Sequence, residues 1–191
     1  MYGLTQFRRL YLHKLYKMIS CDLFGGLGNN LFQLATAYGI HKKYGYDLVI
    51  PSQVDRGNIG IYGQSTKLEF NDIFENKFKY NDDLSGSLRK YIHTDHVPPS
   101  QTDFSYNEIP VVDDVCYHGY FQSEKYFQGV DISQEFIINN DNLNIIKYKY
   151  NELFNKKNIS LHYRLAGDRV NDYMQHYHRD VSLEYYQKAL S

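Results

Sequence analysis

Short apolar runs alternate with segments of helical periodicity along this chain, and the pattern predicts an α/β fold. Residues 18–24 are apolar enough to form a short buried strand. After them, apolar residues recur at helical spacing through Leu31, Leu34, Ala35 and Tyr38, which predicts a helix. Further elements are expected as strands at 46–51, 111–117 and 159–163, and as a final helix at 182–190. Strands that alternate with helices favour a mostly parallel sheet with ligands at its carboxyl ends.

The remaining segments give weaker signals. Residues 52–66 are polar and rich in glycine, which predicts a loop on the ligand side of the sheet. Residues 94–110 contain three prolines and are expected to form an irregular connection. Residues 120–127 are expected to begin a helix or turn, and residues 139–158 to form a helix and a linker. Residues 72–93 show no clear period.

The glycine-rich turn at 25–33 is the strongest chemical signal in the chain. Glycines between a strand and a helix let backbone N–H groups approach a phosphate, a carboxylate or a sugar hydroxyl. The dinucleotide fingerprint is incomplete, because Leu31 stands where its third glycine is required. The acid that should follow the second strand is also missing, since that strand runs into Pro51. Two interpretations therefore stay open here, a ligand-binding turn and a tight turn without a ligand.

Composition and charge exclude several classes of protein. The 191 residues carry a net charge of −1, which gives no reason to expect a nucleic-acid partner. Cys21 and Cys116 fall in predicted buried segments and are expected to be free thiols. The histidines in 93–96 and 176–178 lack the spacing of structural zinc sites, so we expect solvated loop residues and no metal. The glycosylation sequon at 158–160 enters a predicted core strand, which favours a chance match.

The first 17 residues are basic and have an apolar helical face. Arginines, His13 and Lys14 interrupt the apolar run that a signal peptide needs, and no segment approaches the roughly 20 apolar residues of a membrane span. We therefore expect a soluble or peripheral protein. Residues 4–17 are expected either to rest on a membrane surface as an interfacial helix or to be an extension upstream of a start at Met18, and we favour the extension.

Several segments together resemble the α-1,2-fucosyltransferase family. The turn 25–33, Gly-Gly-Leu-Gly-Asn-Asn-Leu-Phe-Gln, resembles the signature that opens the family, with Asn30 in place of its usual glutamine. Residues 117–127 resemble the family's Gly-Tyr-Trp-Gln-Ser-Glu-Lys-Tyr-Phe segment. Residues 159–168 resemble its His-x-Arg-Arg-Gly-Asp segment, and residues 183–189 resemble the helix that follows. The matches keep the family's order and extend from Met18 to the C-terminus.

The resemblance implies a GT-B glycosyltransferase with two Rossmann-like halves that face each other across a cleft. Residues 1–17 are then a basic extension, residues 18–155 the acceptor-side half, and residues 156–191 the start of the nucleotide-binding half. This second half is expected to be incomplete, because the family's late serine- and tryptophan-rich segment is absent. The implied reaction is inverting, metal-independent transfer of L-fucose from GDP-fucose to a galactose-containing glycan in α-1,2 linkage, without a cofactor.

The resemblance also implies roles for residues of the second half. Arg164 is expected to neutralise the departing β-phosphate, because a metal-free reaction needs a cation there. The alternative is that Arg164 pairs with Asp168 or with another surface acid. Leu165 stands where the family has a second arginine, for which Arg169 is a candidate substitute. His162 is expected to orient the loop or the nucleotide, or else to be a core histidine, and Asp168 is expected to brace the loop.

On the acceptor side, the sugar or the acceptor is expected to lie near Gly25, Gly26, Gly28 and Asn29. No carboxylate stands out as a general base. The polar cluster Gln122, Glu124 and Lys125 is interpreted as a helix cap or as part of the family segment, and we favour the cap slightly. The leading hypothesis is thus a fucosyltransferase. The alternatives are a catalytically inactive remnant that at most binds glycan or nucleotide, and an unrelated nucleotide-binding domain.

Overall fold

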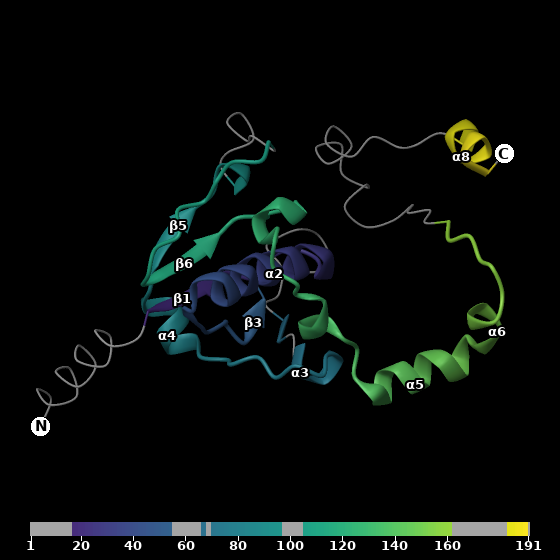
Figure 1. Cartoon of the computed structure of the whole chain (residues 1–191), viewed down its shortest axis with the longest axis horizontal. Coiled ribbons are helices and arrows are strands. Elements are labelled where there is room, and N and C mark those ends of the chain that lie inside the picture. The colour runs from purple at the N-terminus through teal and green to yellow at the C-terminus, as the bar shows by residue number, and fades with distance from the viewer. Residues whose placement is uncertain (1–16, 55–65, 68–69, 97–104, 162–182, 191) are drawn as a thin grey trace, which may run out of the picture.

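A four-stranded, all-parallel sheet forms the centre of the protein. The computed structural model describes residues 17–54, 66–67, 70–96, 105–161 and 183–190. The sheet has the order β2–β1–β6–β5, with β1 at Met18–Cys21, β2 at Asp47–Leu48, β5 at Arg89–Ile92 and β6 at Val115–His118 (Figure 1). The chain runs from β2 at one edge to β5 at the other and then inserts β6 beside β1. The expected α/β fold with a mostly parallel sheet is therefore correct.

Helix α2, Leu27–Tyr44, covers one face of this sheet (Figure 1). Its buried stripe includes Leu34, Ala37 and Ile40, which join the apolar side chains of β1 and β6 in the core. The helix ends at Gly45, whose φ of 71° places it in the left-handed conformation that glycine adopts without strain. Gly39 lies so close to η3, Glu124–Phe127, that an added Cβ would stand 2.7 Å from Cβ of Phe127.

The two faces of the sheet differ in polarity. Side chains alternate along a strand, so Ile19 and Cys21 share the apolar face with Val115 and Tyr117. The opposite face carries polar side chains, namely Ser20, Asp22, Cys116 and His118. Helix α4, Asp82–Ser87, lies on this second face, where Ser85 Oγ is 2.6 Å from Ser20 Oγ.

The other elements surround the sheet or extend from it. Strands β3, Gln53–Val54, and β4, Thr66–Lys67, form an antiparallel pair. The rest are α3 at Phe70–Ile73, η2 at Thr94–His96, η4 at Ser133–Phe136, α5 at Asn140–Lys149, α6 at Asn151–Phe154 and α8 at Leu183–Leu190. Figure 1 shows α5 and α6 extending away from the sheet. Among the described residues, no helix is both long and apolar enough to cross a membrane.

The predicted core strand at 159–163 is wrong in the part that the structure describes. Residues 159–161 have no regular structure, and Ile159 and Leu161 are 80% and 55% exposed. An apolar run forms a strand only where a neighbouring strand accepts its backbone hydrogen bonds, and no such partner lies beside it in the described residues. The sequon at 158–160 therefore lies on exposed chain, so burial gives no reason to treat it as a chance match.

Candidate functional site at the carboxyl edge of the sheet

The glycine-rich turn leaves β1 at its carboxyl end. Gly25 has a φ of 77°, and a Cβ there would lie 2.6 Å from Nδ2 of Asn29, so this position requires glycine. A Cβ on Gly26 or Gly28 would meet no atom within 4 Å, which leaves the outer side of the turn open. Gly26 caps α2 without a side-chain hydrogen bond. No side chain at these two glycines therefore stands in front of the first backbone N–H groups of α2, as a ligand-binding turn requires.

Two buried amides hold the turn in this shape. Asn30 Nδ2 donates to the carbonyl of Phe24 at 2.8 Å and to Gln33 Oε1 at 3.2 Å. The same Gln33 oxygen accepts from the backbone N–H of Phe24 at 3.1 Å. Both side chains are fully buried. Asn30 and Gln33 therefore fix the turn from inside, while Asn29 remains on the surface side.

The segment after β6 is fixed by a buried carboxylate. Asp95 accepts hydrogen bonds from the backbone N–H groups of Tyr120 at 3.0 Å and Phe121 at 2.7 Å. Although burial favours the neutral acid, these bonds and one from His93 lower the pKa of Asp95. His93 is fully buried and Asp95 is 6% exposed. The expectation that both are solvated loop residues is wrong, because their polar atoms are satisfied inside the protein.

The close packing around Gly119 gives a testable prediction. An added Cβ would lie 2.7 Å from His93 Cβ and 2.8 Å from both Asp95 Oδ1 and Phe121 Cζ, all of them in buried side chains. We expect Gly119→Ala to lower the free energy of unfolding by about 2 kcal/mol, because the overpacked core must shift. Urea denaturation measures this change.

Gly86→Ala is the matched control for this substitution, since a Cβ there meets open space in α4. We expect the control to be neutral or slightly stabilising. Equal stability of the Gly119→Ala variant and the wild type would show that the packing around Gly119 is looser than described.

The glycine-rich turn 25–33 and the segment 117–127 meet at the carboxyl edge of the sheet. Gln122 Nε2 donates to Asn29 Oδ1 at 2.7 Å across 93 positions of sequence. Phe24, before the turn, packs against the edge of Tyr120 with ring centroids 4.9 Å apart. Glu124 begins η3 after the Ser123 cap, whose oxygen accepts from the N–H of Lys125 at 3.3 Å. The capping side chain is thus Ser123, which lies outside the cluster of Gln122, Glu124 and Lys125, and Gln122 connects the segment to the turn.

An acid–imidazole pair that the sequence did not reveal lies at the same edge. Asp22 follows β1 and His118 ends β6, and Asp22 Oδ2 is 2.7 Å from His118 Nδ1. Lys90 Nζ is 2.8 Å from the same oxygen, and Cys116 Sγ donates to Oδ1 at 3.4 Å. The His118 ring stacks on Phe24 at 4.8 Å, which connects the pair to the glycine-rich turn. Strand-end positions were the only sequence signal for this pair.

Electrostatics keep Asp22 ionised. Burial alone would raise its pKa, but the hydrogen bonds from His118 and Lys90 outweigh that effect and lower the pKa to about 2. An ionised carboxylate can only accept, so His118 Nδ1 carries a proton, and in the neutral ring the lone pair lies on Nε2. Burial, with the Asp22 carboxylate nearby, raises the pKa of the Cys116 thiol to about 12. Cys116 and Cys21 are buried free thiols, as expected, and neither is a reactive thiolate at neutral pH.

The lowered pKa of Asp22 predicts a pH dependence of stability. The folded-state pKa lies below the usual 3.8, so the contribution is full above about pH 4 and is lost as the pH falls toward 2. We expect Asp22→Asn to lower the free energy of unfolding by about 2 kcal/mol at pH 7, and the difference to shrink below pH 4. Denaturant titrations from pH 7 to pH 3 measure this, with the exposed Asp113→Asn as control. A difference independent of pH would contradict the assigned ion pair.

Several sequence-predicted site residues lie outside the described residues: His162, Arg164, Asp168, Arg169, the histidines at 176–178 and the basic segment 4–17. Of the predicted site residues, the structure brings together Gly25, Gly26, Gly28 and Asn29, and it adds Gln122 beside them.

No group of three or more His, Cys, Asp or Glu side chains arranged to hold a metal ion occurs within the described ranges. Comparison with known proteins finds no family model, no curated protein and no solved structure that matches this chain.

Proposed function

We propose that this protein is a glycosyltransferase that moves L-fucose from GDP-fucose to a galactose-containing glycan. The observation that supports the proposal most is the contact between Asn29 and Gln122. These residues belong to the two segments, 25–33 and 117–127, that resemble the fucosyltransferase family. Each segment resembles the family by itself, and both lie at the carboxyl edge of a parallel sheet, where α/β proteins bind their ligands.

The position of this contact within the strand order adds support. From β1 the chain leads to β2 on one side, while β6 lies on the other side of β1. The strand order therefore reverses between β1 and β6, and α/β proteins bind their ligands in the crevice above the strand ends at such a switch point. In our proposal the acceptor and the fucose enter this crevice, and the backbone amides after Gly25 bind sugar hydroxyls. We propose a GT-B arrangement in which residues from 156 onward bind the nucleotide.

Transfer to a hydroxyl requires a group that removes the hydroxyl proton. We assign that role to His118, whose Nε2 carries a lone pair because Nδ1 donates to Asp22. In the reaction Nε2 accepts the proton while the acceptor oxygen forms a bond to the anomeric carbon of fucose. The bond from that carbon to the β-phosphate oxygen breaks, and GDP leaves with the electron pair. Asp22 holds the imidazole in the required tautomer and stabilises its protonated form.

By the resemblance, Arg164 stabilises the charge on the departing phosphate, and Arg169, His162 and Asp168 support it. A planar guanidinium suits this purpose because it can bind two phosphate oxygens at once. The proposal needs no metal and no cofactor, with GDP-fucose as the donor substrate.

Calorimetric titration with GDP and GDP-fucose tests the proposed function. We expect both to bind, and we expect GDP to bind in preference to an adenine dinucleotide. The absence of binding at millimolar GDP-fucose would rule out the proposed transferase. Preference for the adenine dinucleotide would instead assign the chain to an unrelated class of nucleotide-binding protein.

A further inference from the structure

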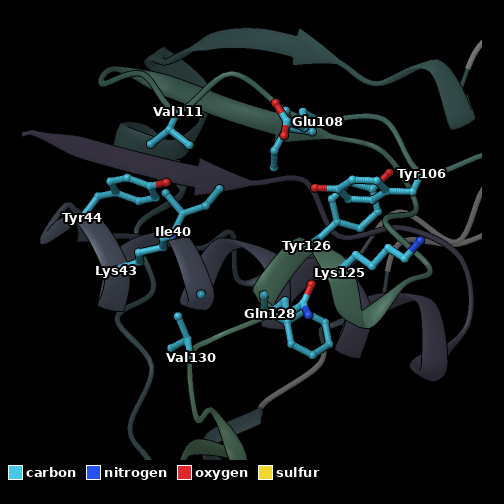
Figure 2. Close-up of a pocket in the computed structure, with 13 residues that line it drawn as sticks. Ile40, Lys43, Tyr44, Tyr106, Glu108, Val111, Lys125, Tyr126, Gln128 and Val130 are labelled. Atoms are coloured by element: carbon cyan, nitrogen blue, oxygen red, sulfur yellow. The ribbon is translucent and has the colours of Figure 1, made fainter.

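A groove runs beside the C-terminal half of α2. It lies between the C-terminal half of α2 and the extended segment 105–112, and η3 closes one side (Figure 2). Its volume is about 210 Å³. The polar and aromatic residues that line it include Lys43, Tyr44, Tyr106, Glu108, Lys125 and Tyr126.

The walls of the groove are held by contacts within the fold. Tyr117, on β6, donates from its hydroxyl to the carbonyl of Pro110 at 3.0 Å and accepts from the N–H of Val112 at 3.4 Å. These bonds fix the segment 105–112 above the sheet. On the other side, the absence of a side chain on Gly39 allows η3 to approach α2 at Phe127. The groove therefore exists before any ligand binds.

Aromatic rings stand at both ends of the groove, with polar groups between them. Figure 2 shows Tyr44 at one end, Tyr106 beside Tyr126 at the other, and Glu108 and Gln128 in the middle. The rings of Tyr106 and Tyr126 are 5.0 Å apart, and the Tyr126 hydroxyl lies 3.2 Å from Nε2 of the buried His93. Tyr44 and Tyr106 remain 46% and 40% exposed. The groove thus has accessible tyrosine rings at both ends, and contacts within the fold hold Tyr106 and Tyr126 in place.

The charges of the groove do not favour an anion. The ammonium groups of Lys43 and Lys125 lie 5.4 Å from the ring centroids of Tyr44 and Tyr106, so one face of each ring already partners a lysine. Glu108 adds a carboxylate that repels a phosphate. A purely apolar ligand fits no better, because Glu108, Gln128 and the two lysines would lose water without gaining partners. The lining suits a neutral ligand with both apolar faces and hydroxyl groups.

We propose that this groove is a saccharide subsite that binds the remote sugar residues of the acceptor glycan. A sugar ring has C–H faces that pack on tyrosine rings and hydroxyls that bond to carboxylate and amide groups. Residues 125–128 line the groove, and Gln122, just before η3, contacts Asn29 at the transfer site. The segment 122–128 therefore connects the subsite with the proposed site of fucose transfer at Asn29. The identity of the ligand rests on the proposed function, but its binding needs no nucleotide.

Calorimetry without nucleotide tests the subsite, using a galactose-terminated tetrasaccharide and free galactose as probes. We expect the tetrasaccharide to bind more tightly than galactose. We also expect Tyr106→Ala and the isosteric Glu108→Gln to weaken the binding of the tetrasaccharide by about tenfold or more, since the first removes a ring that packs on a sugar and the second removes the carboxylate. Tyr148→Ala, at a side chain 92% exposed on α5, is the control and should leave the affinity unchanged.

The outcomes separate the subsite from the proposed function. Unchanged tetrasaccharide affinity in both groove variants, or equal binding of tetrasaccharide and galactose, would overturn the subsite. If GDP-fucose binds the wild type and the tetrasaccharide does not, the subsite fails while the proposed donor stands. Loss of tetrasaccharide affinity in the groove variants, with GDP-fucose affinity retained, is the result that supports the subsite.

Discussion

His118→Asn is expected to lower kcat for fucose transfer by about 10²- to 10³-fold, the range of a lost general base. The asparagine amide can still donate to Asp22 in place of Nδ1, but it has no equivalent of the Nε2 lone pair. KM for the acceptor and the calorimetric affinity for GDP-fucose should change little, since the side chain acts on the transferred proton. Steady-state kinetics with a galactose-terminated acceptor measure these quantities.

The split between kcat and KM separates catalysis by His118 from a structural role. A structural role would weaken the binding of GDP-fucose and acceptor together with kcat, whereas a lost base lowers kcat alone. The charged groups of this cluster are Asp22, which contacts the imidazole directly, and Lys90, which contacts Asp22. Asp22→Asn should also lower kcat, because its amide can stabilise the other tautomer. A kcat for His118→Asn equal to that of the wild type would contradict the assignment.

Arg164→Ala is expected to abolish measurable binding of GDP. In the proposed reaction this guanidinium carries the charge-assisted bonds to the diphosphate, which are about twice as strong as neutral hydrogen bonds. Loss of a comparable transition-state contact costs about two to three orders of magnitude in rate. Calorimetric titration of the variant with GDP measures the binding.

Lys188→Gln is the control for Arg164→Ala. Lys188 is a mostly exposed cation on α8, paired with Glu184 at 2.9 Å, and its removal should leave GDP affinity unchanged. Unchanged GDP affinity in Arg164→Ala itself would refute the role proposed for the guanidinium.

The interior strands, helix α2 and the edge strand β2 were predictable from the sequence, and the edge strand β5 was not. Apolar runs over β1 and β6 and the helical stripe of α2 mark segments buried on several sides. Strand β5 was missed because it lies at the edge of the sheet, where the exposed residues Arg89 and Lys90 blur the apolar pattern. Helix α4 has six residues, too few to establish a period. The strand expected at 159–163 was wrong for the opposite reason. Ile159 and Leu161 are apolar, as in a core strand, but they are exposed.

The candidate site was predictable only where local sequence determines it. The turn at Gly25 depends on a backbone conformation that glycine signals directly. The pair of Asp22 and His118 depends on the register that places β1 beside β6, which no local pattern reveals. The burial of His93 and Asp95 likewise depends on hydrogen bonds to a segment about 25 residues away.

A transfer assay tests the central claim most directly. The wild-type protein is incubated with GDP-fucose and a galactose-terminated oligosaccharide, and the products are analysed by mass spectrometry and by NMR for linkage. We predict a fucosylated oligosaccharide with an α-1,2 bond, formed in equal amount to the GDP released. Bound GDP-fucose with no product would indicate a protein that binds nucleotide without catalysis, and would contradict the transfer reaction proposed for this edge of the sheet.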